Sequence, residues 1–132
     1  MVPRILLSDD DPAFADAARQ GLGRYGFDVT IADDGGSAIE IWDRARDDVP
    51  FHLCLVDFHM PRATGLDVVR HVRSADSGGG TPCVLMSAML DEDIRRQAEM
   101  VRVYRVLDKP VRLKMLGDVV KDALSDAYGW AG

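Results

Sequence analysis

The chain has 132 residues, of which 47% are hydrophobic and 29% charged, a balance typical of one soluble globular domain with a sizeable core. A formal net charge of −6 argues against nonspecific binding to nucleic acid or to an anionic membrane. No apolar run approaches the roughly 20 residues that span a bilayer, and the apolar start is too short for a secretion signal. The cytoplasm is therefore the expected location.

The first part of the chain predicts a strand, a helix and a second strand. The apolar run at 4–8 predicts the first strand. Asp11 followed by Pro12 predicts a helix start, because aspartate is a good N-cap and proline suits the first helical position. Helical spacing of apolar residues continues toward Gly26, a favourable C-terminal stop, and the run at 28–32 predicts the second strand.

A second helix and the central strand come next. After a turn at 33–36, Ser37 and Glu40 have the spacing of a capping box, which predicts a helix that starts at Ser37 and closes at 47–50. The apolar run at 52–57 then predicts a third strand. This run lacks alternation of polar and apolar residues, as expected of a strand buried on both faces of a parallel sheet.

The rest of the chain continues the alternation. Its expected elements are a helix over Leu66 to about Ser74, a flexible link at 77–82, a strand at 83–87, a helix over Asp91 to Met100, a strand at 103–107, and a last helix with Leu113, Leu116, Val120, Leu124 and Ala127 facing inward. Such alternation predicts right-handed crossovers and a doubly wound parallel sheet with helices on both faces. We expect one α/β domain over residues 1–132, in which 129–132 are a tail or the start of a linker.

Polar side chains follow four of the five predicted strands. They are Asp9 and Asp10 after the first strand, Asp57 at the end of the third, Ser87 after the fourth and Lys109 after the fifth. Ligands of open parallel sheets bind at the carboxyl ends of the strands, so these side chains are expected to converge. Two carboxylates about 4 Å apart repel by roughly 4 kcal/mol at an effective dielectric constant near 20. The cluster therefore calls for a cation, and oxygen ligands suit Mg²⁺.

These residues resemble those of the receiver domain of two-component response regulators, over essentially the whole chain. The pieces that carry the resemblance are Ile5-Leu6-Leu7-Ser8-Asp9-Asp10-Asp11-Pro12, Leu55-Val56-Asp57-Phe58-His59-Met60-Pro61 with Gly65, Leu85-Met86-Ser87-Ala88, and Lys109-Pro110. The resemblance implies a flavodoxin-like, CheY-like sheet of five strands in the order 2-1-3-4-5, flanked by five helices.

The resemblance also implies the roles of the metal-binding residues. Asp10 and Asp57 would ligate Mg²⁺ directly, the backbone carbonyl of His59 would supply another ligand, and Asp9 would act mostly through water. The side chain of His59 either influences water access to the phosphoryl group or is simply exposed to solvent.

The remaining roles concern phosphoryl transfer. Asp57 would accept a phosphoryl group from a sensor histidine kinase or a histidine phosphotransfer protein, while Ser87 and Lys109 would each contact a phosphoryl oxygen. The family usually has a cis bond between this lysine and Pro110, which fits the near confinement of cis bonds to proline. Such a domain switches a surface for a downstream protein, and it is no enzyme beyond assisting its own phosphorylation and dephosphorylation.

Two other functions remain open. One is a docking module that works without phosphorylation. The other is a phosphatase with Asp57 as nucleophile, although His59 occupies the place where such an enzyme would want a second carboxylate as acid and base. Taken one at a time, the polar residues could also be ordinary helix caps, turn formers or surface residues.

The chain departs from the family at the position three before the lysine, where Val106 replaces the usual aromatic residue. Tyr104 lies two residues earlier and is expected on the same side of the strand, so our hypothesis is that Tyr104 takes over part of the switch or that output uses another route. Thr64 also stands where the family commonly has an acidic residue, and Arg102 where it commonly has a small residue. Residues 91–121 carry eight Lys or Arg and six Asp or Glu, so +2, and an acidic partner would suit this less acidic segment.

Two cysteines make no disulfide framework. Cys54 and Cys83 both fall in apolar runs, and we expect them to be buried and reduced.

Overall fold

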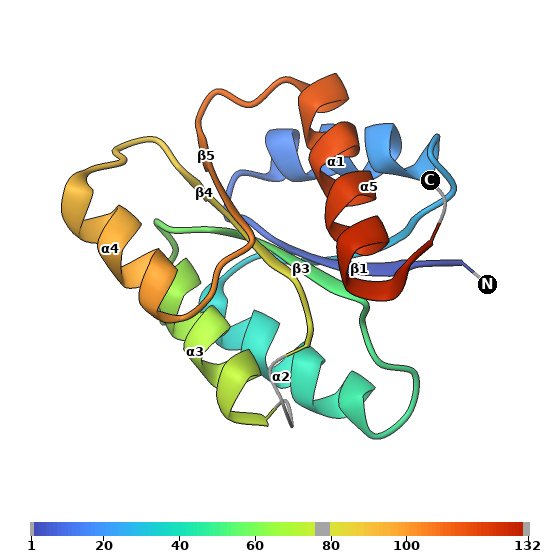
Figure 1. Cartoon of the computed structure of the whole chain (residues 1–132), viewed down its shortest axis with the longest axis horizontal. Coiled ribbons are helices and arrows are strands. Elements are labelled where there is room, and N and C mark those ends of the chain that lie inside the picture. The colour runs from blue at the N-terminus through green and yellow to red at the C-terminus, as the bar shows by residue number, and fades with distance from the viewer. Residues whose placement is uncertain (1, 76–79, 131–132) are drawn as a thin grey trace.

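A computed structural model describes residues 2–75 and 80–130 of the protein. Its strands are β1 (Arg4–Ser8), β2 (Asp28–Ala32), β3 (Leu53–Asp57), β4 (Cys83–Ser87) and β5 (Arg105–Asp108). Its helices are α1 (Pro12–Gly23), α2 (Gly35–Arg46), α3 (Gly65–Ala75), α4 (Glu92–Met100) and α5 (Leu113–Tyr128). The strands are parallel and form one sheet in the order β2-β1-β3-β4-β5, which confirms the predicted fold (Figure 1). Residues 77–79 of the predicted link and 131–132 of the tail lie outside the described residues.

The sheet separates two apolar layers. Helices α1 and α5 cover one face, and helices α2, α3 and α4 cover the other (Figure 1). Every residue of β3 and β4 is buried, which explains why their sequences lack polar alternation. Cys54 and Cys83 lie in these strands and are buried, as predicted. Among the described residues, no helix combines the length and apolar character that a membrane span requires.

The two edge strands carry charged residues at their ends. Strand β2 begins with exposed Asp28, and strand β5 begins with exposed Arg105 and ends with exposed Asp108. Each edge strand is hydrogen-bonded to a neighbour on one side, β2 to β1 and β5 to β4.

Helix α1 begins as the sequence predicts, but helix α2 does not. Asp11 caps α1 by accepting hydrogen bonds from the N–H groups of Ala13 and Phe14. Helix α2 begins at Gly35 with Asp34 as its N-cap, so the prediction of a start at Ser37 was wrong. Asp34 lies three residues before Ser37 and reaches its N–H directly, at 2.7 Å, which places the cap one turn earlier.

The ends of two other elements also differ from the predictions. Helix α1 ends at Gly23, and Gly26 follows in the loop with a φ of 89°, a conformation that glycine adopts without strain. In helix α5, Leu116, Val120 and Leu124 are buried as predicted, but the first residue, Leu113, is 38% exposed. Ala127 near its other end is also exposed, so the inward face spans only the middle of this helix.

Tyr104 and Val106 lie on opposite sides of the sheet, so the prediction that they share a side was wrong. Strand β5 starts only at Arg105, so strand alternation does not extend back to Tyr104. Val106 packs with the layer of α2 to α4, whereas Tyr104 packs with the layer of α1 and α5. The Tyr104 hydroxyl donates to Asp126 of α5 at 2.6 Å, and this bond, with burial, raises its pKa to about 12.

A hydrogen bond and ring contacts to His52, the residue before β3, hold the end of α5 in place. The Tyr128 hydroxyl donates to the His52 carbonyl oxygen at 2.7 Å, and the Trp130 ring meets the His52 ring edge-on. The N–H of Arg4 donates to His52 Nδ1 at 2.9 Å, which requires that nitrogen to be unprotonated. Burial, helped by the charge of Arg4, lowers the pKa of His52 from its ordinary value of 6.5.

We expect the protein to lose stability as the pH falls from 7 through 6.5, because the unfolded chain then protonates His52 more readily than the folded chain. The measurement is the free energy of unfolding from urea titrations between pH 7.5 and pH 5, for wild type and His52→Asn. The asparagine amide oxygen can accept the same N–H without titrating. Equal pH slopes in the two proteins would contradict this assignment.

Gly65 allows helix α3 to start against the end of β3. A Cβ at this position would lie 2.5 Å from the carbonyl oxygen of Asp57 and 2.9 Å from Leu85, closer than real Cβ contacts. Gly23 at the end of α1 offers a matched control, because a Cβ there would meet no atom within 4 Å.

We expect Gly65→Ala to destabilise the protein by about 1–3 kcal/mol, the usual effect of overpacking. Gly23→Ala should be neutral or stabilising by up to about 1 kcal/mol. Urea unfolding of the two variants checks both values. A Gly65→Ala protein as stable as wild type would mean that α3 does not pack against Asp57 as described.

Candidate functional site

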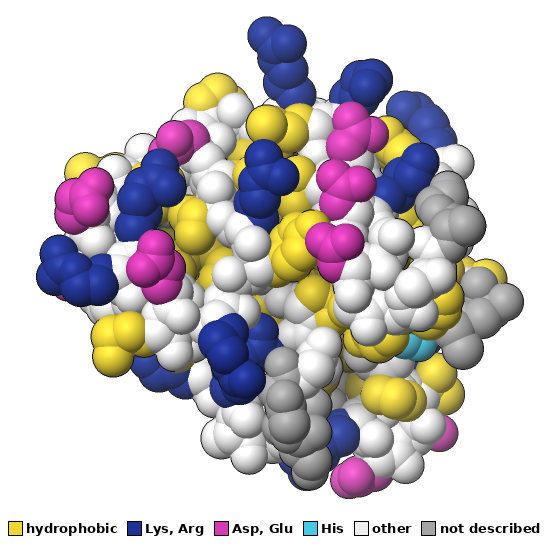
Figure 2. Space-filling model, in the orientation of Figure 1, with side chains coloured by type: hydrophobic (Ala, Val, Ile, Leu, Met, Phe, Trp, Pro, Cys, Tyr) yellow, Lys and Arg dark blue, Asp and Glu magenta, His cyan; other side chains and the backbone are white. Residues whose placement is uncertain are grey.

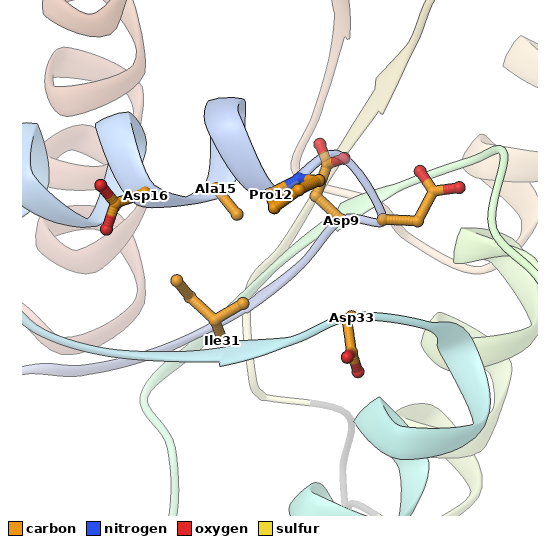
Figure 3. A pocket seen from close by; sticks show the side chains of 7 residues that line it. Asp9, Pro12, Ala15, Asp16, Ile31 and Asp33 are labelled. Atoms are coloured by element: carbon orange, nitrogen blue, oxygen red, sulfur yellow. The ribbon is translucent and has the colours of Figure 1, made fainter.

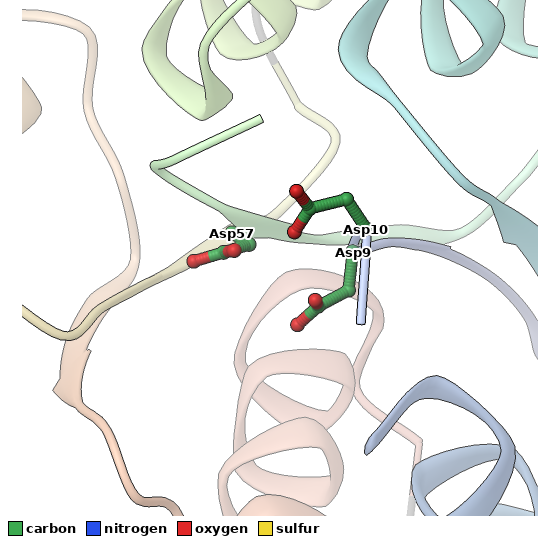
Figure 4. A group of neighbouring side chains, drawn as sticks. All are labelled: Asp9, Asp10 and Asp57. Carbon is green, nitrogen blue, oxygen red and sulfur yellow. The ribbon is translucent and has the colours of Figure 1, made fainter. Parts of the chain in front are cut away.

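Three carboxylates meet at the carboxyl edge of the sheet. Asp9 and Asp10 follow β1, Asp57 ends β3, and each offers a carboxylate oxygen within 4.8 Å of the others (Figure 4). The register places Ser8 of β1 beside Val56 of β3, so the residues that follow are neighbours. Asp9 and Asp57 are buried, whereas Asp10 is exposed. The convergence predicted from the sequence is therefore confirmed for these three residues.

Lys109 brings the positive charge of this cluster from the end of β5. Its Nζ lies 2.8 Å from Asp9 Oδ2 and 3.5 Å from Asp57 Oδ2. Burial pulls the pKa of Lys109 down, but the hydrogen bond to Asp9 and the charge of Asp57 outweigh it, and the pKa is raised. The ammonium also lies 4.8 Å from the centre of the Phe14 ring. The peptide bond between Lys109 and Pro110 is cis, as the resemblance implied.

The carboxylate of Asp57 has more negative than positive charge around it. Burial raises the pKa of its carboxyl group, Lys109 lowers it, and the negative charges of Asp9 and Asp10 raise it again, with a net increase. Three carboxylates thus face one ammonium group, and a bound cation would offset their repulsion. Because the donors are all oxygen atoms, the cluster fits Mg²⁺, and Asp10 is exposed toward solvent where Mg²⁺ can keep its waters.

Ser87 and His59 complete the predicted set. Ser87 ends β4, is fully buried, and accepts a hydrogen bond from the Met89 N–H at 3.2 Å, a bond that does not use the proton of its own hydroxyl. His59 lies in the loop after β3 with an exposed side chain whose ring meets Phe58 edge-on. Its carbonyl as a metal ligand, and the influence of its ring on water access, stay predictions.

Two hollows open beside the cluster. One, of about 560 Å³, lies between α1 and β2, where Ala15 and Ile31 face each other and Asp9 and Asp33 lie toward one end (Figure 3). The other, of about 300 Å³, includes Lys109 and Phe14 in its lining. A small ion or a small anionic group therefore has open approaches to the carboxylates and to the lysine.

The structure adds two contacts that the sequence analysis missed. Phe14 packs on the Lys109 ammonium, and its place in the first turn of the helix after Asp11 was the signal that could have suggested it. Arg62 forms a bidentate ion pair with Asp34, with distances of 3.0 and 3.1 Å. The two residues are 28 positions apart, and no motif in the sequence links them.

Comparisons with known proteins point to one protein family. The family model described as response regulator receiver domain matches residues 5–121. The chain is 31% identical over 121 residues to the response regulator protein PilR of Pseudomonas aeruginosa, covering 92% of this chain and 26% of PilR. It is 38% identical over 85 residues to the response regulator MprA of Mycobacterium leprae, covering 64% of this chain and 35% of MprA. The chain thus spans about a quarter to a third of these two relatives.

Solved structures agree on the fold. A CheY-like response regulator receiver domain protein from Methanospirillum hungatei superposes with a TM-score of 0.87 at 22% identity, covering 98% of both chains. Chemotaxis protein CheY4 of Vibrio cholerae superposes with a TM-score of 0.82 at 22% identity, covering 93% of this chain and 99% of that one.

We expect Asp57→Asn to melt at a higher temperature than wild type at pH 7 in the absence of divalent ions. The pKa of Asp57 is raised in the folded state, so its ionised form opposes folding at neutral pH, and this penalty fades as the pH falls toward 3.8. Thermal melts between pH 7 and pH 4 measure the difference, which should shrink with falling pH. Mg²⁺ should then raise the wild-type melting temperature more than that of the variant. A variant less stable than wild type at pH 7 would contradict the charge balance described here.

Proposed function

The chain belongs to the response regulator receiver domain family, and we propose that it is a phosphorylation-controlled switch with Asp57 as phosphoacceptor. The donor would be a phosphohistidine of a sensor histidine kinase or a histidine phosphotransfer protein. The observation that carries this proposal is the convergence of Asp9, Asp10, Asp57 and Lys109 at one edge of the sheet.

The residues of the site suit an in-line transfer. A carboxylate oxygen of Asp57 would form the bond to phosphorus while the bond between phosphorus and the donor imidazole nitrogen breaks. Asp10, Asp57 and the His59 carbonyl would hold Mg²⁺, with Asp9 acting through water, and the bound ion would supply positive charge to the phosphoryl oxygens. Lys109 and the Ser87 hydroxyl would each contact one of those oxygens. The domain would turn over no external substrate. The same residues would assist hydrolysis of its own aspartyl phosphate.

The signal would leave through a surface that changes with phosphorylation, since the modified residue shifts a population between two states. Basic and acidic side chains are interspersed over α4 and α5 on the face in Figure 2. Because residues 91–121 have a net charge of +2, from eight basic and six acidic residues, an acidic protein partner suits this segment. The domain would act in the cytoplasm and bind neither nucleic acid nor membrane itself.

Val106 favours one alternative, a docking module that works without phosphorylation. It stands at the usual position of the aromatic switch residue, and Tyr104, held by Asp126 on the other side of the sheet, does not replace it there. Against this alternative, a docking module has no need of buried carboxylates that repel each other.

We expect the intact mass of the wild type to rise by one phosphoryl group on exposure to acetyl phosphate with Mg²⁺. Chelation of Mg²⁺ should abolish the increase, because the carboxylates then repel the anionic donor. Asp57→Asn should stay unmodified, whereas Asp48→Asn, a change at an exposed aspartate beyond the end of α2, should be modified like wild type. An unmodified wild type would favour the docking module, and continued turnover of donor without a stoichiometric adduct would favour a phosphatase.

A further inference from the structure

We propose that Arg62 is a positioning residue, which clamps the loop after β3 onto the start of α2 and so holds the His59 carbonyl in place for Mg²⁺. This inference rests on the proposed function and adds a residue outside the phosphoacceptor cluster. The loop runs from Phe58 to Thr64, between β3 and α3.

The clamp is a fork of hydrogen bonds from one guanidinium group. Arg62 donates to both carboxylate oxygens of Asp34, at 3.1 and 3.0 Å, and to the hydroxyl of Ser37 at 3.1 Å. The Asp34 carboxylate also accepts the Ser37 N–H and thereby caps α2. Planar bidentate pairing is the geometry in which an arginine–carboxylate pair is most specific. The loop is therefore tied to the first turn of α2 in one orientation.

Two glycines make room for this contact. A Cβ on Gly36 would lie 2.6 Å from Arg62 Cζ, so the guanidinium rests directly on the backbone of the helix start. A Cβ on Gly35 would collide with the Ala63 carbonyl group, and the Gly35 N–H donates to the Pro61 carbonyl oxygen at 3.3 Å. The backbones of the loop and of α2 thus approach each other as closely as glycine allows.

The backbone of Arg62 is itself strained. Its φ of 70° lies in the left-handed region, which glycine and asparagine adopt far more readily than arginine. Such a conformation persists only where the surroundings hold it, and it is concentrated at functional sites. The bonds to Asp34 and Ser37 provide that hold.

The segment that Arg62 clamps is also connected to the candidate metal site through hydrogen bonds. The Met60 sulfur accepts a hydrogen bond from the buried Ser8 hydroxyl at 2.9 Å, and Ser8 directly precedes Asp9. On the other side of His59, the Phe58 N–H donates to the Met86 carbonyl oxygen at 2.7 Å. His59 therefore lies between fixed points at 58 and at 60–62. If its carbonyl binds Mg²⁺, the clamp sets where that oxygen lies relative to Asp10 and Asp57.

Arg62→Gly separates positioning from stability, because glycine relieves the backbone strain while it removes the guanidinium group. We expect the dissociation constant of Mg²⁺, measured by calorimetric titration of the full chain, to rise by about tenfold, the low end for residues that orient metal ligands. The melting temperature without metal should stay close to that of wild type. Asp34→Asn, which keeps a cap acceptor but loses the charge, should weaken Mg²⁺ binding in the same direction.

Arg70→Ala is the matched control. Arg70 forms a surface ion pair with Asp67 of α3, donates to Gln97 of α4, and has a similar side-chain exposure, 47% against 53% for Arg62, so these bonds hold it to helices rather than directly to the loop. We expect it to leave Mg²⁺ affinity unchanged. A change of less than about threefold in Arg62→Gly, or an equal loss in Arg70→Ala, would overturn the inference alone. A wild type that binds no Mg²⁺ would overturn the proposed function and the inference with it.

Discussion

The mutual repulsion of Asp9, Asp10 and Asp57 is the constraint on which the rest of the site depends. Their oxygens lie within 4.8 Å of one another, and two of the three residues are buried. The Lys109 ammonium group neutralises part of this negative charge. Its hydrogen bond to Asp9 joins residues that are 100 positions apart in the sequence. The sheet order brings these strand ends together, so the fold has to form before the charges can balance.

The features that were predicted correctly depend on short-range patterns. Buried parallel strands show as unbroken apolar runs, and Asp11-Pro12 marks a helix start through local capping chemistry. The site residues could be located because polar side chains at the carboxyl ends of parallel strands share one edge of the sheet. The family resemblance supplied the strand order and the cis bond before Pro110, which local patterns do not specify.

The features that were missed depend on contacts between distant segments. Ser37 has the spacing of a capping residue, yet α2 starts earlier because Gly35 lets its first turn approach the loop at Ala63. Strand alternation placed Tyr104 beside Val106, but the strand starts one residue too late for that rule to apply. The ion pair of Arg62 and Asp34 joins two loops, and no motif in either loop indicates that these two residues pair. In each case, tertiary packing overrides a sound local rule.

The charged ends of β2 and β5 have a consequence for behaviour at high concentration. An edge strand exposes unpaired backbone groups that can template a strand from another molecule, and charged residues there are a common protection. Asp28 at one edge, with Arg105 and Asp108 at the other, would have to lose hydration for two copies to join their sheets. Concentrated solutions should therefore resist edge-to-edge joining of sheets, and neutralising these three side chains would weaken that protection.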